Sequence, residues 1–175
     1  MVKAVIFDMD GVLIDTEKWL GKYWCQAANE AGFPMEKKHA LSIRSLAGEY
    51  AGPYLQEIFG EAFSYQTIRQ RRKDLMSKHI AEHGIEKKPG VDELLDYLHQ
   101  KGIKTAVATA TDEVRAKDYL TQIGIYEKFD RIICATMVAH GKPKPDIYRY
   151  ACEQIGEKPE DCIAVEDSPN GVRSA

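Results

Sequence analysis

The sequence predicts an α/β protein: a doubly wound parallel sheet with a Rossmann-like core and an inserted all-helical cap. Short apolar segments that favour strands recur at 5–7, 103–109, 131–135 and 162–165, and helical patterns separate the last three. Helical patterns alone fill residues 16–86, and the polar segment Glu-Lys-Lys-Pro-Gly at 86–90 is the expected linker back to the core. We therefore predict an α/β core from residues 1–15 and 87–175, and a helical cap from residues 16–86.

The first strand ends at two acids one residue apart, Asp8 and Asp10, and then at Gly11, which can adopt a positive φ. Ligands of open α/β sheets bind at the carboxyl ends of strands, and two acids there without a local basic partner favour a cation. A hard divalent ion that prefers oxygen ligands, Mg²⁺, meets this need. Taken alone, Asp-x-Asp-Gly is also ordinary turn chemistry.

In the cap, apolar residues recur at helical spacing from Thr16 to Ala31, and further helices are expected around 43–46, over 54–59 and over 68–83. The core resumes after Pro89 with three expected helices, at 91–100, 112–123 and 146–155, each followed by a strand. Asp112 is the expected cap of the second of them. Alternation of this kind predicts parallel strands joined by helices.

Composition restricts the partners. The 24 Lys and Arg residues against 27 Asp and Glu residues give a net charge of −3, so nothing favours nucleic acid or an anionic membrane. The 4 cysteines are scattered without Cys-x-x-Cys spacing, which favours free thiols in a reducing cytoplasm. No apolar stretch is long enough to span a bilayer, and no signal peptide fits before the first strand. A cytoplasmic location is expected.

Polar groups collect where the predicted strands end. Thr109 ends the second strand and Glu166-Asp167 end the last, while Lys142 lies in a proline-restricted loop. Four acids repel one another unless a cation neutralises them, and a lysine and a threonine suit the oxygens of an anionic substrate. A phosphate ester satisfies both conditions, and an aspartate can attack phosphorus to form an aspartyl-phosphate.

Asp8-x-Asp10, Thr109, Lys142-Pro143 and Glu166-Asp167, in this order, resemble the four motifs of the haloacid dehalogenase-like hydrolase superfamily. With a helical insert after the first motif, the chain is most similar to the subgroup of β-phosphoglucomutase and phosphoglycolate phosphatase. The resemblance spans nearly the whole sequence. It implies that a cap closes over the site, with hinges near 14–17 and 86–90.

The resemblance also implies roles. Asp8 would be nucleophile and Mg²⁺ ligand, and Asp10 would be acid and base while its carbonyl binds the metal. Thr109 and the Ala110 amide would hold phosphoryl oxygens. The remaining expected site residues are Lys142 beside Asp8 and the phosphate, Asp167 as metal ligand, Glu166 beside it or behind it, and Arg44 and Ser45 as substrate contacts from the cap.

From the roles that the resemblance implies, we expect a Mg²⁺-dependent phosphatase that acts on a small phosphorylated metabolite, such as a sugar phosphate. Leu20 stands where mutases of the subgroup have a histidine, which favours water as acceptor, and phosphomutase remains the alternative. Members usually continue for several tens of residues past the last motif, whereas this sequence ends at Ala175. The carboxyl end of the core is therefore expected to be incomplete, and a catalytically incompetent fragment is the second alternative.

Overall fold

The computed structural model describes residues 1–175 and contains one parallel sheet with the strand order β3-β2-β1-β4. All three neighbouring pairs are parallel, and Ala4 of β1 lies between Lys104 of β2 and Cys162 of β4. The predicted doubly wound parallel sheet is confirmed. The strands are β1 (Ala4–Phe7), β2 (Lys104–Thr109), β3 (Arg131–Cys134) and β4 (Cys162–Val165).

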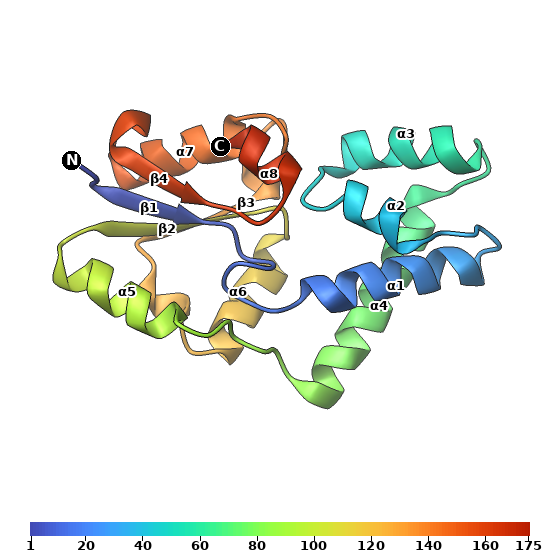
Figure 1. Cartoon of the computed structure of the whole chain (residues 1–175), viewed down its shortest axis with the longest axis horizontal. Helices are drawn as coiled ribbons and strands as arrows, with labels where there is room; N and C mark the ends of the chain where they lie inside the picture. Colours follow the sequence, from blue (N-terminus) through green and yellow to red (C-terminus); the bar gives the residue numbers. More distant parts are fainter.

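Helices cover both faces of this sheet (Figure 1). Val5, Phe7 and Val107 face a buried cluster shared with the first two core helices, α5 and α6. Ile6 and Ala106, the alternate residues, face α7. Burial on both faces explains why these strands are continuously apolar. The core helices are α5 (Val91–Gln100), α6 (Glu113–Gln122), α7 (Asp146–Ile155) and α8 (Pro169–Ser174), and short 3-10 turns lie at Tyr126–Lys128, Ala135–Met137 and Pro159–Asp161.

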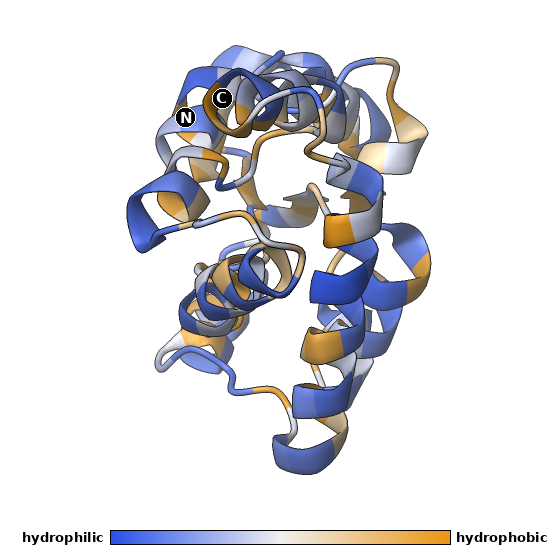
Figure 2. Ribbon diagram, turned by 90° about the vertical axis from the view of Figure 1, so that its right-hand side faces the viewer, coloured by the Kyte–Doolittle hydropathy of each residue, from blue (hydrophilic) through white to orange (hydrophobic).

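The segment between β1 and α5 forms helices and no strand, as predicted, and lies beside the sheet in Figure 1. Its own hydrophobic cluster includes Trp24, Leu55, Phe63 and Ile68. Figure 2 shows hydrophilic and hydrophobic residues interspersed along the helical ribbons. These helices are α1 (Glu17–Glu30), α2 (Lys37–Ser42), α3 (Gly48–Phe59) and α4 (Tyr65–His83).

The prediction of a cap helix around residues 43–46 is wrong. Residues 43–46 form no helix, because α2 ends at Ser42 and the chain then turns. Ser45 has φ 55°, in the left-handed region that a right-handed helix does not use. The Asn170 side chain donates hydrogen bonds to the carbonyls of Ser42 and Arg44, at 3.3 and 2.9 Å. Contacts with the core therefore replace helical bonds here, and the apolar spacing gave no sign of them.

Two linker segments connect the helical segment to the core, and they run beside each other. The Asp15 amide donates to the Glu86 carbonyl at 2.8 Å, and the Lys88 amide donates to the Leu13 carbonyl at 2.9 Å. The Lys88 ammonium also lies 2.8 Å from Asp15 Oδ1. We propose that residues 16–86 form the cap and residues 1–15 and 87–175 the core, with these paired linkers as the hinge.

Strand β4 forms one edge of the sheet and pairs with β1 only. Ile163, in the middle of β4, is 46% exposed, unlike its apolar counterparts in β1 and β2. Ala164, which points to the opposite face, is exposed as well, so this edge strand is poorly covered on both faces. None of the helices combines the length and the apolar character needed to cross a membrane.

Candidate active site

The site lies where the direction in which successive strands are added to the sheet reverses. The chain moves from β1 outward to β2 and β3 and then returns to add β4 on the other side of β1. The connections that leave the carboxyl ends of β1 and β4 diverge at this point, which leaves a crevice there. Asp8 follows β1 directly, and Glu166 and Asp167 follow β4 directly. Residues more than 150 positions apart in the sequence are thus brought to one edge.

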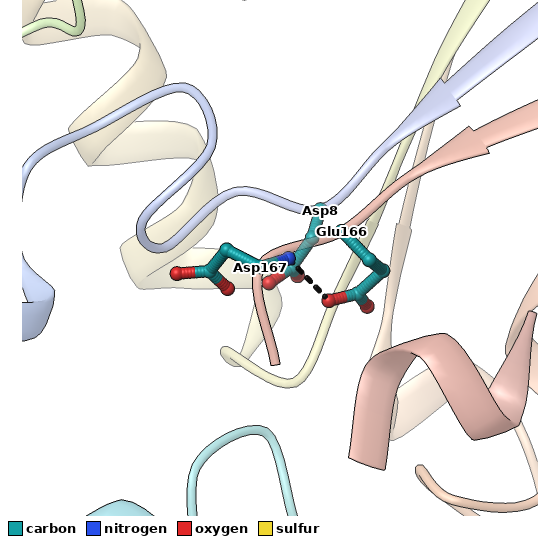
Figure 3. A group of neighbouring side chains, drawn as sticks. All are labelled: Asp8, Glu166 and Asp167. Atoms are coloured by element: carbon teal, nitrogen blue, oxygen red, sulfur yellow. Dashed lines mark hydrogen bonds between the residues drawn. The ribbon is translucent and has the colours of Figure 1, made fainter. Parts of the chain in front are cut away.

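Asp8, Glu166 and Asp167 form an acidic cluster, with one carboxylate oxygen of each within 4.8 Å of the others. Figure 3 shows the three side chains gathered where β1 and β4 end. Asp8 Oδ2 and Asp167 Oδ1 are buried and have no hydrogen-bond partner. Buried carboxylate oxygens without donors are costly, so this donor set fits a divalent cation that binds oxygen.

Lys142 is the only lysine buried in this region, and its side chain has no exposed surface. Its ammonium donates to Asp8 Oδ1 at 2.9 Å, to the Ala108 carbonyl at 3.0 Å and to Glu166 Oε1 at 2.5 Å. The Tyr148 hydroxyl donates to the same Glu166 oxygen at 2.6 Å. All three donor positions of the ammonium are therefore used. A single cation lies between two buried carboxylates.

The excess of carboxylates over cations contributes to a raised pKa of Asp8. Burial, followed by the charges of Glu166 and Asp10, raises the pKa of Asp8 to about 7, although the Lys142 ammonium opposes the shift. The pKa of Lys142 is raised by Asp8 and Glu166, which outweigh its burial. Burial is thus the main cause of the shift at Asp8, and the neighbouring carboxylates add to it, whereas carboxylates alone raise the pKa of Lys142. The cluster accordingly attracts a further positive charge.

Asp10 is positioned by two hydroxyl groups. Thr16 donates to Oδ1 of Asp10 at 2.5 Å, and Thr111 donates to Oδ2 at 3.0 Å. The Thr111 amide in turn donates to the Thr109 hydroxyl at 3.1 Å. Both Asp10 oxygens are thus held by donors, and Thr109 supports this arrangement from the end of β2. Sequence patterns gave no indication of Thr16 or Thr111, because neither stands at a conspicuous position.

The cap reaches the acidic cluster through one loop. Arg44 forms an ion pair with Asp167 and places its Nε 2.7 Å from Glu17 Oε2. The Ala47 amide donates to the carbonyl of Lys142 at 2.9 Å. Burial is the main cause that raises the pKa of Glu17 to about 8, while Arg44 opposes it. Glu17 was not expected from the sequence, since an acid in the first turn of a helix is ordinary.

A cavity of about 520 Å³ lies between cap and core. Five expected site residues line it: Asp8, Asp10, Arg44, Ser45 and Ala110. The other four expected residues form the layer below and beside it, namely Thr109, Lys142, Glu166 and Asp167. The structure thus gathers the residues predicted from separate strand ends around one cavity.

Gly11 has no room for a side chain. Its φ is +85°, and a Cβ there would lie 1.8 Å from Asp167 Oδ2. Gly32 has nearly the same φ, +86°, and nothing within 4 Å of its Cβ position. We expect substitution by alanine at either position to lower the free energy of unfolding by about 1–2 kcal/mol, because an alanine with a positive φ strains the backbone. Only Gly11→Ala should also displace Asp167 and weaken metal affinity.

Metal affinity from calorimetry and unfolding free energy from urea titration check this prediction, with Gly32→Ala as the matched control. Equal metal affinities in the two variants would contradict it.

The fold and the site together define a class of protein: a doubly wound α/β core in which carboxylates at the strand ends face a buried lysine below an inserted set of helices. A family model described as haloacid dehalogenase-like hydrolase matches residues 2–175. The chain belongs to this family, as the four motifs predicted, and is an enzyme of the phosphoric monoester hydrolase type.

Relatives of this chain include phosphatases and a mutase. The phosphorylated carbohydrates phosphatase of Thermotoga maritima is 32% identical, over 99% of this chain and 80% of that protein. Hexitol phosphatase A of Escherichia coli is 30% identical, over 98% of this chain and 77% of that protein. The crystal structure of β-phosphoglucomutase from Clostridium difficile superposes with a TM-score of 0.86 at 25% identity, covering 99% of this chain and 80% of that one.

Proposed function

We propose that this chain is a Mg²⁺-dependent phosphatase that hydrolyses a small phosphorylated carbohydrate through an aspartyl-phosphate. The observation that carries the proposal is the buried acidic cluster, in which Asp8 combines a free oxygen, Oδ2, with a lysine on its other oxygen. The names of the relatives from Thermotoga maritima and Escherichia coli support a carbohydrate phosphate as substrate. The four free cysteines fit the cytoplasmic location that we propose.

In this proposal Asp8 attacks phosphorus with Oδ2 while Lys142 holds Oδ1 and offsets the charge of the incoming phosphate. Asp10, oriented by Thr16 and Thr111, gives its proton to the leaving oxygen. The same carboxylate then accepts a proton from the water that hydrolyses the aspartyl-phosphate. The Ala110 amide and Thr109 would hold phosphoryl oxygens at the end of β2.

The metal would be held by Asp8 and Asp167 together with the Asp10 carbonyl. When bound, Mg²⁺ supplies positive charge that offsets the acids and the phosphoryl oxygens. Glu166 is better placed to orient the metal ligands than to bind the metal itself, because its Oε1 already accepts hydrogen bonds from Lys142 and Tyr148. Its Oε2 also accepts from the Asp167 amide at 3.2 Å, which fixes the orientation of that residue.

We propose transfer to water in preference to transfer within a sugar. Leu20, on α1, lines the same cavity as Asp10 and carries no group that exchanges a proton. A mutase would return an isomeric sugar phosphate, whereas a phosphatase releases inorganic phosphate. The mutase alternative rests on the likeness to β-phosphoglucomutase. Product analysis with glucose phosphates separates the two activities.

Hydrolysis of an aryl phosphate tests the proposed function. We expect the chain to release inorganic phosphate in the presence of Mg²⁺, and EDTA should abolish this release because the acids are then left without a counter-ion. Restoring Mg²⁺ in excess should restore the rate. Turnover that survives EDTA would contradict the metal requirement. A folded chain without turnover in Mg²⁺ would favour the incompetent fragment.

The stabilisation by Mg²⁺ should depend on pH. The folded pKa of Asp8, about 7, lies above its ordinary value of 3.8, so the metal-free fold loses stability as pH rises from about 4 to about 7. A metal binds only the ionised carboxylate, so a proton competes with it below about pH 7. Apparent Mg²⁺ affinity should fall by about tenfold for each pH unit below that value.

Thermal unfolding with and without Mg²⁺, from about pH 5.5 to about pH 8, measures this effect. We expect the rise in Tm caused by Mg²⁺ to increase with pH, and Asp8→Asn to remove most of the increase. A Tm rise that is constant across the range would show that Asp8 does not titrate with metal binding.

A further inference from the structure

Tyr148, on α7, lies behind the acidic cluster and away from the cavity between cap and core. It is 5% exposed and lines no part of that cavity. It packs instead in the buried cluster that includes Ile6, Ala106 and Cys152, on the face of the sheet that α7 covers. Any influence of Tyr148 on the reaction must therefore pass through other residues.

Two groups of the site contact Tyr148. Its hydroxyl donates a hydrogen bond to Glu166 Oε1 at 2.6 Å, and its ring centre lies 5.2 Å from the ammonium nitrogen of Lys142. The ring thus offers its π face to the same ammonium that Glu166 binds. Burial, followed by the hydrogen bond to Glu166, raises the pKa of Tyr148 above its ordinary value, so the hydroxyl keeps its proton and acts as a donor.

Packing accounts for the ring of Tyr148 but not for its hydroxyl. A phenylalanine would fill the same space beside Ile6 and Cys152 and would bring no polar atom that needs a partner. The hydroxyl makes a single hydrogen bond, to the carboxylate of Glu166. A role that requires the hydroxyl must therefore be exerted on Glu166.

The oxygen Oε1 of Glu166 has two donors. Lys142 donates to it at 2.5 Å and Tyr148 at 2.6 Å, while the same ammonium donates to Asp8 Oδ1 at the longer distance of 2.9 Å. A carboxylate oxygen that shares its negative charge between two donors attracts each of them less than it would attract a single donor. Tyr148 thus weakens the hold of Glu166 on the ammonium and leaves more of its charge to Asp8.

We propose that Tyr148 is a positioning residue for phosphoryl transfer: its hydroxyl occupies Oε1 of Glu166 and so keeps the Lys142 ammonium shared with the nucleophile. The proposal rests on the proposed phosphatase function, in which Lys142 offsets the charge of Asp8 and of the incoming phosphate. Without the hydroxyl, the ammonium is drawn toward Glu166, and the reacting oxygens lose part of its charge.

Tyr148→Phe tests the role of the hydroxyl, with an aryl phosphate as substrate in excess Mg²⁺. We expect kcat to fall by about tenfold and KM to stay within about twofold, because the lost charge acts on the transition state and Tyr148 does not line the cavity. Lys142 still donates to Glu166 Oε1, so no buried acceptor is left without a donor. Tm should therefore change by less than about 4 °C.

Tyr150→Phe is the matched control. Tyr150 lies on the same helix and packs against the same buried cluster, and its hydroxyl makes no hydrogen bond to Glu166. The change removes one phenolic hydroxyl, as Tyr148→Phe does. It should leave both kcat and KM within about twofold of the wild type.

A double-variant cycle with Glu166→Gln shows whether the effect of Tyr148 passes through Glu166. The amide keeps the shape of the side chain and removes its charge, so it competes only weakly with Asp8 for the ammonium. Tyr148→Phe should then lower kcat by less than about twofold in the Glu166→Gln background, against about tenfold in the wild type. Equal effects in the two backgrounds would indicate a general packing role and overturn the proposal.

The Lys142 ammonium provides a second readout, which needs no turnover. Its side chain has no exposed surface, so its protons are shielded from exchange with water and can be followed by NMR on nitrogen-labelled protein. Loss of the signal in Lys142→Met identifies it. We expect the signal to shift in Tyr148→Phe and to stay unchanged in Tyr150→Phe, because only the first change alters the hydrogen bonds of Glu166.

A Tyr148→Phe protein whose kcat stays within about twofold of the wild type would overturn the proposal and leave the phosphatase function intact. Failure of the phosphatase function is recognised separately, by the absence of any turnover in the wild type. In that case the ammonium signal decides: a shift confined to Tyr148→Phe supports the placement of Lys142 by Tyr148, and the absence of a shift overturns it.

Discussion

Asp8→Asn should reduce phosphatase turnover by about 10⁴-fold or more, because an amide cannot attack phosphorus. The variant should nevertheless fold. Asparagine has nearly the same shape, and its oxygen can still accept from Lys142 at the position of Oδ1. Since Asp8 is buried with a free Oδ2 and a pKa raised to about 7, we expect the metal-free variant to be more stable than the wild type by about 1 kcal/mol.

Steady-state release of inorganic phosphate and urea unfolding without metal measure the two effects. Asp161→Asn is the control, because Asp161 pairs with Lys3 at 2.7 Å beyond the opposite end of the sheet. That change should alter neither quantity appreciably. An Asp8→Asn protein that retains turnover within about tenfold would refute the role of Asp8 as nucleophile.

Lys142→Met should destabilise the metal-free chain by about 3–5 kcal/mol, because it leaves the carboxylates of Asp8 and Glu166 buried without their shared cation. Turnover should also fall by at least about 10²-fold, since positive charge beside the transferred phosphate is lost. Added Mg²⁺ should recover part of the stability, as it supplies charge to the same acids. Urea unfolding with and without Mg²⁺ provides the measurement.

Lys144→Met is the matched control, because Lys144 lies in the same loop with an exposed side chain. Its unfolding free energy should stay within about 0.5 kcal/mol of the wild type. Adding Glu166→Gln to Lys142→Met should restore part of the lost stability, since one of the two unpaired charges is removed. If the double variant is no more stable than Lys142→Met, charge imbalance is not the cause.

The order of elements and the motif residues were determined by the sequence itself. The helices Val91–Gln100 and Asp146–Ile155 and the strand Cys162–Val165 begin and end where the apolar spacing predicts. Local patterns suffice for such elements because each buries a face whose period is 3.6 or 2 residues. Asp8, Asp10, Glu166 and Asp167 were predictable for a related reason: acids at the carboxyl ends of parallel strands converge on one edge.

Only the tertiary structure showed the partners of these residues. Tyr148 on α7, Thr16 before α1 and Thr111 after β2 orient the acids from three different elements, and nothing in their local sequence distinguishes them. The turn at residues 43–46 depends on Asn170, more than 120 positions away. Burial and long-range contacts decide such features, and neither has a period that can be read along the chain.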